Sequence, residues 1–97
     1  MEINLGEDKK FQQYITEKTE IDKLKLTGES FKQMSLTPDE EYVIKEFLYY
    51  TKDESFGVDF ITEIFSVADK DIGLSILRVM NLMRYNKREK EKNNVIL

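Results

Sequence analysis

The sequence predicts a mostly α-helical domain with a small C-terminal β-hairpin, built from 97 residues. Two observations lead to this fold class. Several segments repeat apolar residues at the spacing of one helix face, and each begins near a residue that can cap a helix. The polar stretch 86–94 is followed by an apolar triplet, as in a hairpin that returns to the core. The length fits a single domain, in which residues 1–36 form an N-terminal helix and its connection and residues 37–97 form the core.

The N-terminal part is expected to form one helix. Asp8 can cap its beginning, and acidic residues lie near its start. An imperfect apolar stripe begins at Phe11, and the helix is expected to end near residues 20–23. Residues 24–27 alternate between apolar and polar, which allows a short strand before the turn at residues 28–30.

The clearest local signal is the start of the next helix. Thr37 can cap it, and Pro38 is well suited to the first helical position because its φ is already helical. Glu40 stands three residues after Thr37, which is the spacing of a capping box. We predict a helix from Pro38 to about Lys52. Its apolar face consists of Val43, Ile44, Phe47, Leu48 and Thr51.

Two further helices are expected after a break near residue 55. Asp59 can cap a helix over residues 59–67, and a tight connection at 68–71 leads to a longer helix over 72–85, with Asp71 as its cap.

Helix 72–85 is apolar nearly all round, and its few polar side chains form a narrow stripe. A helix this apolar must be covered on most sides. We therefore expect a homodimer with this helix in or near the interface, formed by Ile76, Val79, Met80 and Met83. The alternative is a monomer in which the other helices of the chain wrap around it.

The C-terminal tail allows two interpretations. In one, the helix runs on to about Lys92, and its basic residues suit the negative end of the helix dipole. In the other, residues 83–86 become extended, the charged stretch forms a hairpin tip, and residues 95–97 return as a short strand. The hairpin gives three apolar residues a place to be buried.

Charge divides the chain into an acidic body and a basic end. Residues 1–71 carry seventeen acidic and nine basic residues, a net charge of −8. Residues 72–97 carry six basic and two acidic residues, a net charge of +4. This division predicts that the basic end meets a negatively charged partner.

The composition argues against an enzyme. The chain has no His and no Cys, which removes the commonest general base, the thiol nucleophile and the usual ligands of zinc. The four Gly residues stand alone, so a Gly-rich phosphate-binding loop is not expected. We therefore expect no catalytic residues, no metal site and no cofactor. The chain begins without a basic, apolar leader, and its longest apolar-rich segment is too short to span a bilayer, so a cytoplasmic protein is expected.

The order and lengths of the expected elements resemble the winged helix-turn-helix family of DNA-binding domains. The residues that carry the resemblance are 36–40, 58–65 and 72–80. The resemblance implies that residues 37–97 form the helix-turn-helix core, that residues 85–97 form its wing, and that helix 72–85 enters the major groove. It also implies a set of DNA-facing residues: Lys70, Gly73, Leu74, Ser75 and Arg78 on the helix, and Lys87, Arg88, Lys90 and Lys92 on the wing.

Two functions follow from these observations. The first is a dimeric, non-enzymatic winged-helix protein that binds double-stranded DNA, such as a transcription regulator or a partition-type adaptor of a phage or plasmid. The alternative is a small helical protein-interaction module, such as a mobile-element inhibitor or adaptor. Segment 37–71 has a net charge of −7. This acidity opposes docking on phosphates, and it fits a variant of the alternative in which the surface mimics DNA.

Overall fold

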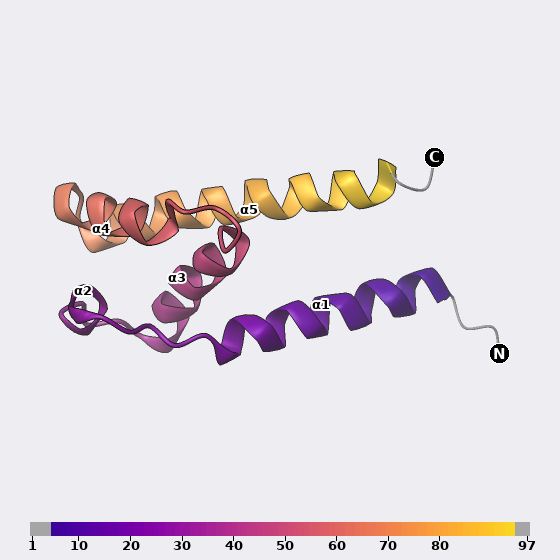
Figure 1. Ribbon diagram of the computed structural model, residues 1–97, viewed down its shortest axis with the longest axis horizontal. Helices are drawn as coiled ribbons and strands as arrows, with labels where there is room; N and C mark the ends of the chain where they lie inside the picture. Colours follow the sequence, from indigo (N-terminus) through magenta and orange to yellow (C-terminus); the bar gives the residue numbers. More distant parts are fainter. Residues whose placement is uncertain (1–4, 95–97) are drawn as a thin grey trace.

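The computed structural model describes residues 5–94, with the side chains of residues 11–29 and 31–91. This part of the chain forms five helices (Figure 1). They are α1 (Leu5–Lys23), α2 (Glu29–Lys32), α3 (Pro38–Tyr50), α4 (Gly57–Val67) and α5 (Lys70–Asn94).

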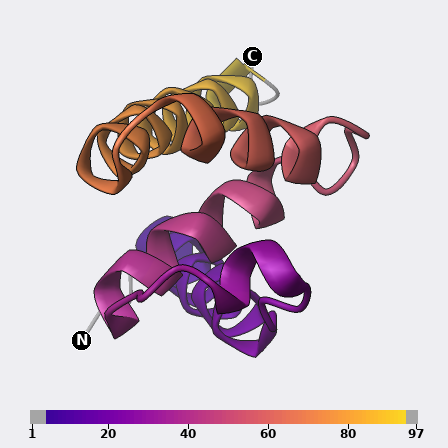
Figure 2. The ribbon, with the colours of Figure 1, turned by 90° about the vertical axis from the view of Figure 1, so that its left-hand side faces the viewer.

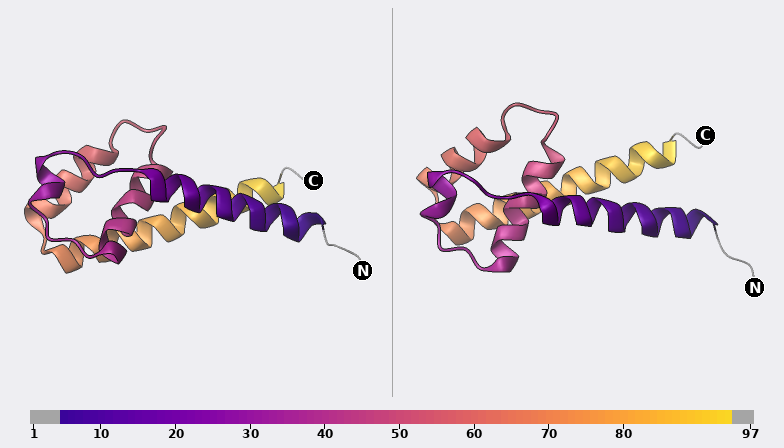
Figure 3. Two further views of the ribbon diagram at one scale, coloured as in Figure 1. Left: turned by 90° about the horizontal axis from the view of Figure 1, so that it is seen from below. Right: turned by 60° about the horizontal axis from the view of Figure 1, so that its bottom comes forward.

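Helix α3 lies in the middle of the molecule. Helices α1 and α2 lie on one side of it, and α4 and α5 lie on the other (Figure 2). The Leu5 end of α1 and the Asn94 end of α5 both project beyond α3 toward the same end of the molecule (Figure 3). The molecule is therefore elongated, with extents of 51 × 25 × 22 Å.

The core lies where α3 packs against α4 and α5. Its fully buried side chains are Ile44, Phe47, Ile61, Leu74 and Leu77. The rings of Phe47 and Phe60 stack with their centroids 5.5 Å apart, which joins α3 to α4. Burial of an apolar side chain of this size contributes roughly 1.5–3 kcal/mol, so these few residues supply much of the driving force for folding.

The predicted capping box at the start of α3 is confirmed. The Thr37 backbone N–H donates to Glu40 Oε1 at 2.9 Å, and the Glu40 backbone N–H donates to the Thr37 hydroxyl at 3.3 Å. The bond from the Thr37 backbone also holds the pKa of the Glu40 carboxyl below its usual range, because it stabilises the charged form.

The predicted β-hairpin is wrong, and with it the wing. Helix α5 continues through residues 86–94 to Asn94, and residues 5–94 contain no strand, including residues 24–27. The charged stretch 86–92 is rich in Lys, Arg and Glu, which favour helix, and it has no Gly or Pro to make a hairpin turn. The apolar triplet 95–97 lies outside the described residues.

Three predicted caps also need correction. Asp8 lies inside α1, Asp59 lies in the first turn of α4, and Asp71 lies in the first turn of α5. Helix α4 begins at Gly57, with Phe56 before it and no side-chain cap. Residue 57 must be Gly in this packing, because a Cβ there would lie 2.5 Å from the hydroxyl oxygen of Thr51.

Helix α3 ends at Tyr50, two residues before the predicted end at Lys52. The buried Thr51 that follows it donates its hydroxyl to the carbonyl of Phe47 at 2.8 Å.

Candidate functional site

Helix α5 has two faces with opposite environments. On its inner face, Leu74 and Leu77 are 1% and 0% exposed. On its outer face, Ile72, Val79, Leu82 and Met83 are 54–65% exposed, and Ile76 is also exposed. We call these five residues the outer face of α5. They form a continuous apolar row that the rest of the chain leaves open to solvent. Leu82 lies at the edge of this face, where it also lines a groove that α5 shares with α1 and α3.

The outer face has the spacing of a helix-pairing seam. Ile72, Ile76, Val79 and Met83 follow one another at intervals of four, three and four residues, as the a and d positions of a coiled coil do. A shallow depression of about 470 Å³ runs along it from Ile72 to Met80.

Three of the four predicted interface residues lie on this face: Ile76, Val79 and Met83. Met80 is half-buried and packs against the core. The sequence prediction did not include Ile72 and Leu82, because helix 72–85 is apolar on nearly every side.

Several cations that the sequence assigned to DNA are paired within the chain. Lys70 Nζ donates to the Ser35 carbonyl at 3.0 Å and lies 3.2 Å from the Glu40 carboxylate. The Arg88 guanidinium lies 3.9 Å from the Glu17 carboxylate and over the ring of Tyr50, with 4.8 Å from its central carbon to the ring centroid. These contacts place Lys70 and Arg88 toward α3 and α1.

Arg84, which was not predicted as a site residue, makes the best-formed ion pair. Both of its terminal nitrogens bind the Glu54 carboxylate, one of them at 2.9 Å. This hydrogen bonding lowers the pKa of Glu54 and raises the pKa of Arg84, since it favours the charged form of each group.

The other predicted DNA contacts are spread around α5. Ser75 is exposed and donates its hydroxyl to the Asp71 carbonyl, and Arg78 lines the groove that α5 shares with α1 and α3. Gly73 is buried beneath Phe65. Lys87 and Lys90 are exposed farther along the helix, and the side chain of Lys92 is outside the described set. The fold therefore does not gather these residues on one surface.

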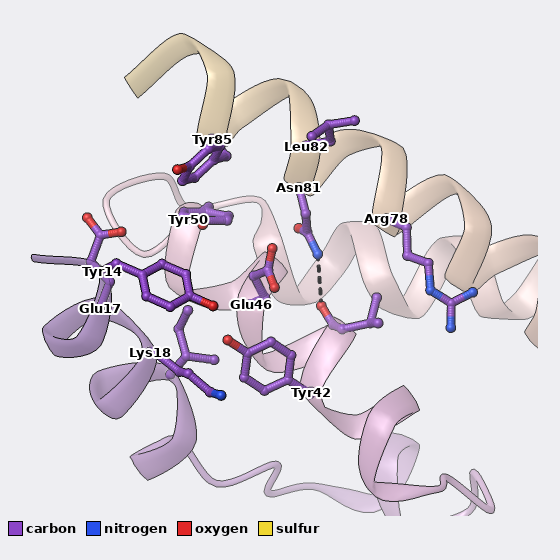
Figure 4. Close-up of a pocket in the computed structure, with 12 residues that line it drawn as sticks. Tyr14, Glu17, Lys18, Tyr42, Glu46, Tyr50, Arg78, Asn81, Leu82 and Tyr85 are labelled. Carbon is purple, nitrogen blue, oxygen red and sulfur yellow. Dashed lines mark hydrogen bonds between the residues drawn. The ribbon is translucent and has the colours of Figure 1, made fainter. Parts of the chain in front are cut away.

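A groove of about 290 Å³ lies where α1, α3 and α5 meet. Tyrosine rings from all three helices line it, and the close-up shows several of them around Glu46 and Asn81 (Figure 4). These tyrosines are Tyr14, Tyr42, Tyr50 and Tyr85. Sequence reasoning did not identify this groove, because its residues come from three helices that only the tertiary structure brings together.

Four polar groups in the groove are partly or fully removed from water. Burial raises the pKa of the half-buried Glu46 carboxyl. Burial, with a smaller effect of the Glu46 charge, also raises the pKa of Tyr42 to about 12 and that of Tyr50 as well. Asn81 is 4% exposed, and its Oδ1 has no hydrogen-bond donor among the described residues.

The described part of the chain has no cluster of three or more acidic side chains placed to hold a metal ion. Within residues 5–94, every helix is too short or too polar to cross a bilayer. Comparisons of this chain with known protein families, curated proteins and solved structures gave no match. The geometry of the outer face and of the groove is therefore the basis for any functional assignment.

Proposed function

We propose that this protein is a non-enzymatic protein-interaction module that forms a homodimer through the outer face of α5. The observation that carries the proposal is the row of five exposed apolar side chains from Ile72 to Met83. Contiguous apolar patches on a soluble surface usually mark an interaction site. Covering the row with apolar surface gains roughly 25 cal/mol for each Å² removed from water.

A second copy of the chain fits this row because the row is self-complementary. With two α5 helices side by side and antiparallel, Ile72 lies opposite the second copy's Met83, and Ile76 lies opposite the second copy's Val79. Every apolar residue of the seam then meets another apolar residue, as a two-fold dimer requires.

Charge favours the antiparallel arrangement over the parallel one. Asp69 and Asp71 are exposed at the N-terminal end of α5, and Lys87 and Lys90 are exposed toward its C-terminal end. Antiparallel pairing places the lysines of one copy near the aspartates of the other, whereas parallel pairing places like charges together. The acidic surface of α3 and α4 stays outside the interface, where it is available to a further partner.

Sedimentation equilibrium between about 1 and 100 μM tests the proposal over the range of a weak to moderate dimer. We expect the wild-type chain to reach a dimer mass, and the Val79→Glu/Met83→Glu variant to remain a helical monomer by circular dichroism. Val67→Glu is the matched control, because Val67 is 80% exposed on α4 and lies off the seam.

Two results would contradict the proposal. One is a wild-type monomer at the highest concentration. The other is a dimer that Val79→Glu/Met83→Glu leaves intact. Salt-sensitive binding of duplex DNA by the monomeric variant would favour the DNA-binding function in its place, because the proposed dimer is then not needed for partner recognition.

A further inference from the structure

We propose that the groove between α1, α3 and α5 binds the guanidinium group of an arginine side chain from a partner protein. The groove is a second site, and this inference does not depend on the dimer. Three features carry it: a carboxyl without a cation, a buried amide oxygen without a donor, and walls made of tyrosine rings.

The carboxyl is that of Glu46 on α3. It is half-buried, and no salt bridge to it is present among the described side chains. Burial raises its pKa, because a carboxylate removed from water loses part of its solvation. A cation with its own N–H donors would replace the missing water and stabilise the carboxylate.

The amide is that of Asn81 on α5. Its Nδ2 donates to the Val43 carbonyl at 3.2 Å. Because a carbonyl can only accept, this bond identifies the atom beside it as the amide nitrogen and the other terminal atom as Oδ1. Oδ1 is left buried and without a donor among the described residues. Asn81 and Glu46 both line the groove, so the amide oxygen and the carboxyl belong to one site (Figure 4).

The walls suit a flat cation. Tyr14, Tyr42 and Tyr50 present aromatic rings in the groove, and a guanidinium stacks on such rings while it donates in its own plane. The same chain already holds one guanidinium in this manner. Arg88 lies over the rings of Tyr49 and Tyr50 beside the Glu17 carboxylate.

The two cationic side chains that line the groove form no hydrogen bond or ion pair with Glu46 or with the amide oxygen of Asn81 among the described residues. Lys18 and Arg78 line the rim, and both are exposed. The Arg78 guanidinium is directed away from Glu46 and Asn81 (Figure 4). Exposed charges at the rim are screened by solvent, so their repulsion of an incoming arginine is small. Five donors in one plane can serve the carboxylate and the amide oxygen together, which an ammonium group does less well.

Titration followed by NMR tests the inference, with the Asn81 side-chain amide signal as the reporter. The probe is the capped peptide acetyl-Gly-Arg-Gly-amide. Its comparison ligands carry lysine or the neutral isostere citrulline, and free L-arginine is a fourth arm. We expect saturable shifts with the arginine peptide at a Kd of about 1 mM, which is typical of a single weak contact. The lysine and citrulline peptides should bind at least tenfold more weakly.

Glu46→Gln should weaken binding of the arginine peptide at least fivefold. This variant is expected to fold, because it removes a poorly solvated charge and keeps the shape of the side chain. Glu41→Gln is the matched control, since Glu41 lies on the same helix, pairs with Lys45 and is outside the groove. It should bind as the wild type does.

The inference is overturned if the citrulline or lysine peptide binds as tightly as the arginine peptide. It is also overturned if Glu46→Gln has no effect, or if the Asn81 signal does not shift. Tighter binding of free L-arginine than of the peptide would overturn the assignment to a protein partner. A monomeric chain that still binds the peptide would leave this inference standing and reject only the dimer.

Discussion

The inner and outer faces of α5 carry similar apolar side chains, yet they differ almost completely in exposure. Leu77 on the inner face is 0% exposed, and Leu82 on the outer face is 60% exposed. The inner face is covered because α3 crosses the molecule there, with α4 beside it. Apart from Leu82 at its edge, which lines the groove shared with α1 and α3, the outer face has no such neighbour within residues 5–94. Apolar composition therefore indicates how much surface must be covered, whereas the tertiary arrangement decides which part of that surface is left for a partner.

The largest expected difference between the two faces is in folding stability. Leu77→Ala removes fully buried methyl groups and leaves a cavity, so it should lower the free energy of unfolding by about 2–5 kcal/mol. Leu82→Ala makes the same chemical change on the outer face, where surface substitutions usually change stability by about 0.5 kcal/mol or less. Urea denaturation followed by circular dichroism, at a concentration low enough to hold the chain monomeric, measures both.

Equal losses of unfolding free energy from the two substitutions would contradict the proposed difference between the two faces. They would mean that the outer face is already covered within one chain. Association should respond in the opposite order, since Met83→Ala removes contact area from the proposed seam and Leu77→Ala does not.

A smaller effect is expected from the charges at the ends of the outer face. Lys87→Glu/Lys90→Glu should weaken dimerisation roughly tenfold in an antiparallel dimer, because each changed side chain then lies near acidic residues of the second copy. Lys25→Glu/Lys32→Glu changes the net charge equally at exposed sites outside α5 and should have little effect. Sedimentation at low and high salt checks this. Dissociation constants that stay equal for all three chains would argue against the antiparallel orientation.

The smallest effect concerns the groove beside the inner face. The pKa of Glu46 is raised in the folded chain. Its contribution to stability is therefore fully present at low pH, where the carboxyl is protonated. That contribution is lost as the pH rises through the pKa of the folded state. Glu46→Gln should therefore gain stability relative to the wild type on going from about pH 4 to about pH 7, by about 1 kcal/mol or less after allowance for solvent screening.

Thermal unfolding of both chains across this pH range checks the sign. The other ionisable groups that line the groove are kept in the comparison: Tyr14, Glu17, Lys18, Tyr42, Tyr50, Arg78 and Tyr85. A stability difference that does not change with pH would contradict the raised pKa. A larger stability gain from Glu46→Gln at low pH than at neutral pH would mean that folding lowers the pKa of Glu46 instead of raising it.

Local signals in the sequence predicted the elements that depend on local interactions. The capping box of Thr37 and Glu40 and the Pro at the first helical position gave the start of α3 correctly, because these contacts lie within four residues of one another. The predicted start of α4 was wrong by two residues, because the helix begins at Gly57 without a side-chain cap, and the prediction relied on a capping residue.

The tail shows the same limit more clearly. Both a helix and a hairpin were consistent with residues 86–94, and the helix is what forms. Two long-range contacts support the helical form, namely Arg84 with Glu54 and Arg88 with Glu17 and Tyr50. Their partners lie at least thirty positions away in the chain, so the sequence pattern of the tail by itself could not select between the two.

The candidate sites divide in the same way. Three of the predicted interface residues lie on the outer face, since an apolar helix must expose some of its surface in so small a domain. The predicted DNA-facing set is dispersed around α5, because ion pairing with the acidic helices turns Lys70 and Arg88 inward. The groove at Glu46 and Asn81 was not predicted at all.

Composition and local patterns were enough to predict the helical class, the capped start of α3, the absence of His and Cys chemistry and the excess of apolar surface on the last helix. Each of these depends on composition or on residues within about one turn of each other. The tertiary structure decided the fate of the tail, the pairing of the basic residues, the face of α5 that stays exposed and the existence of the groove. These properties arise from contacts between segments far apart in the chain, and only the crossing of α3 between α1 and α5 brings those segments together.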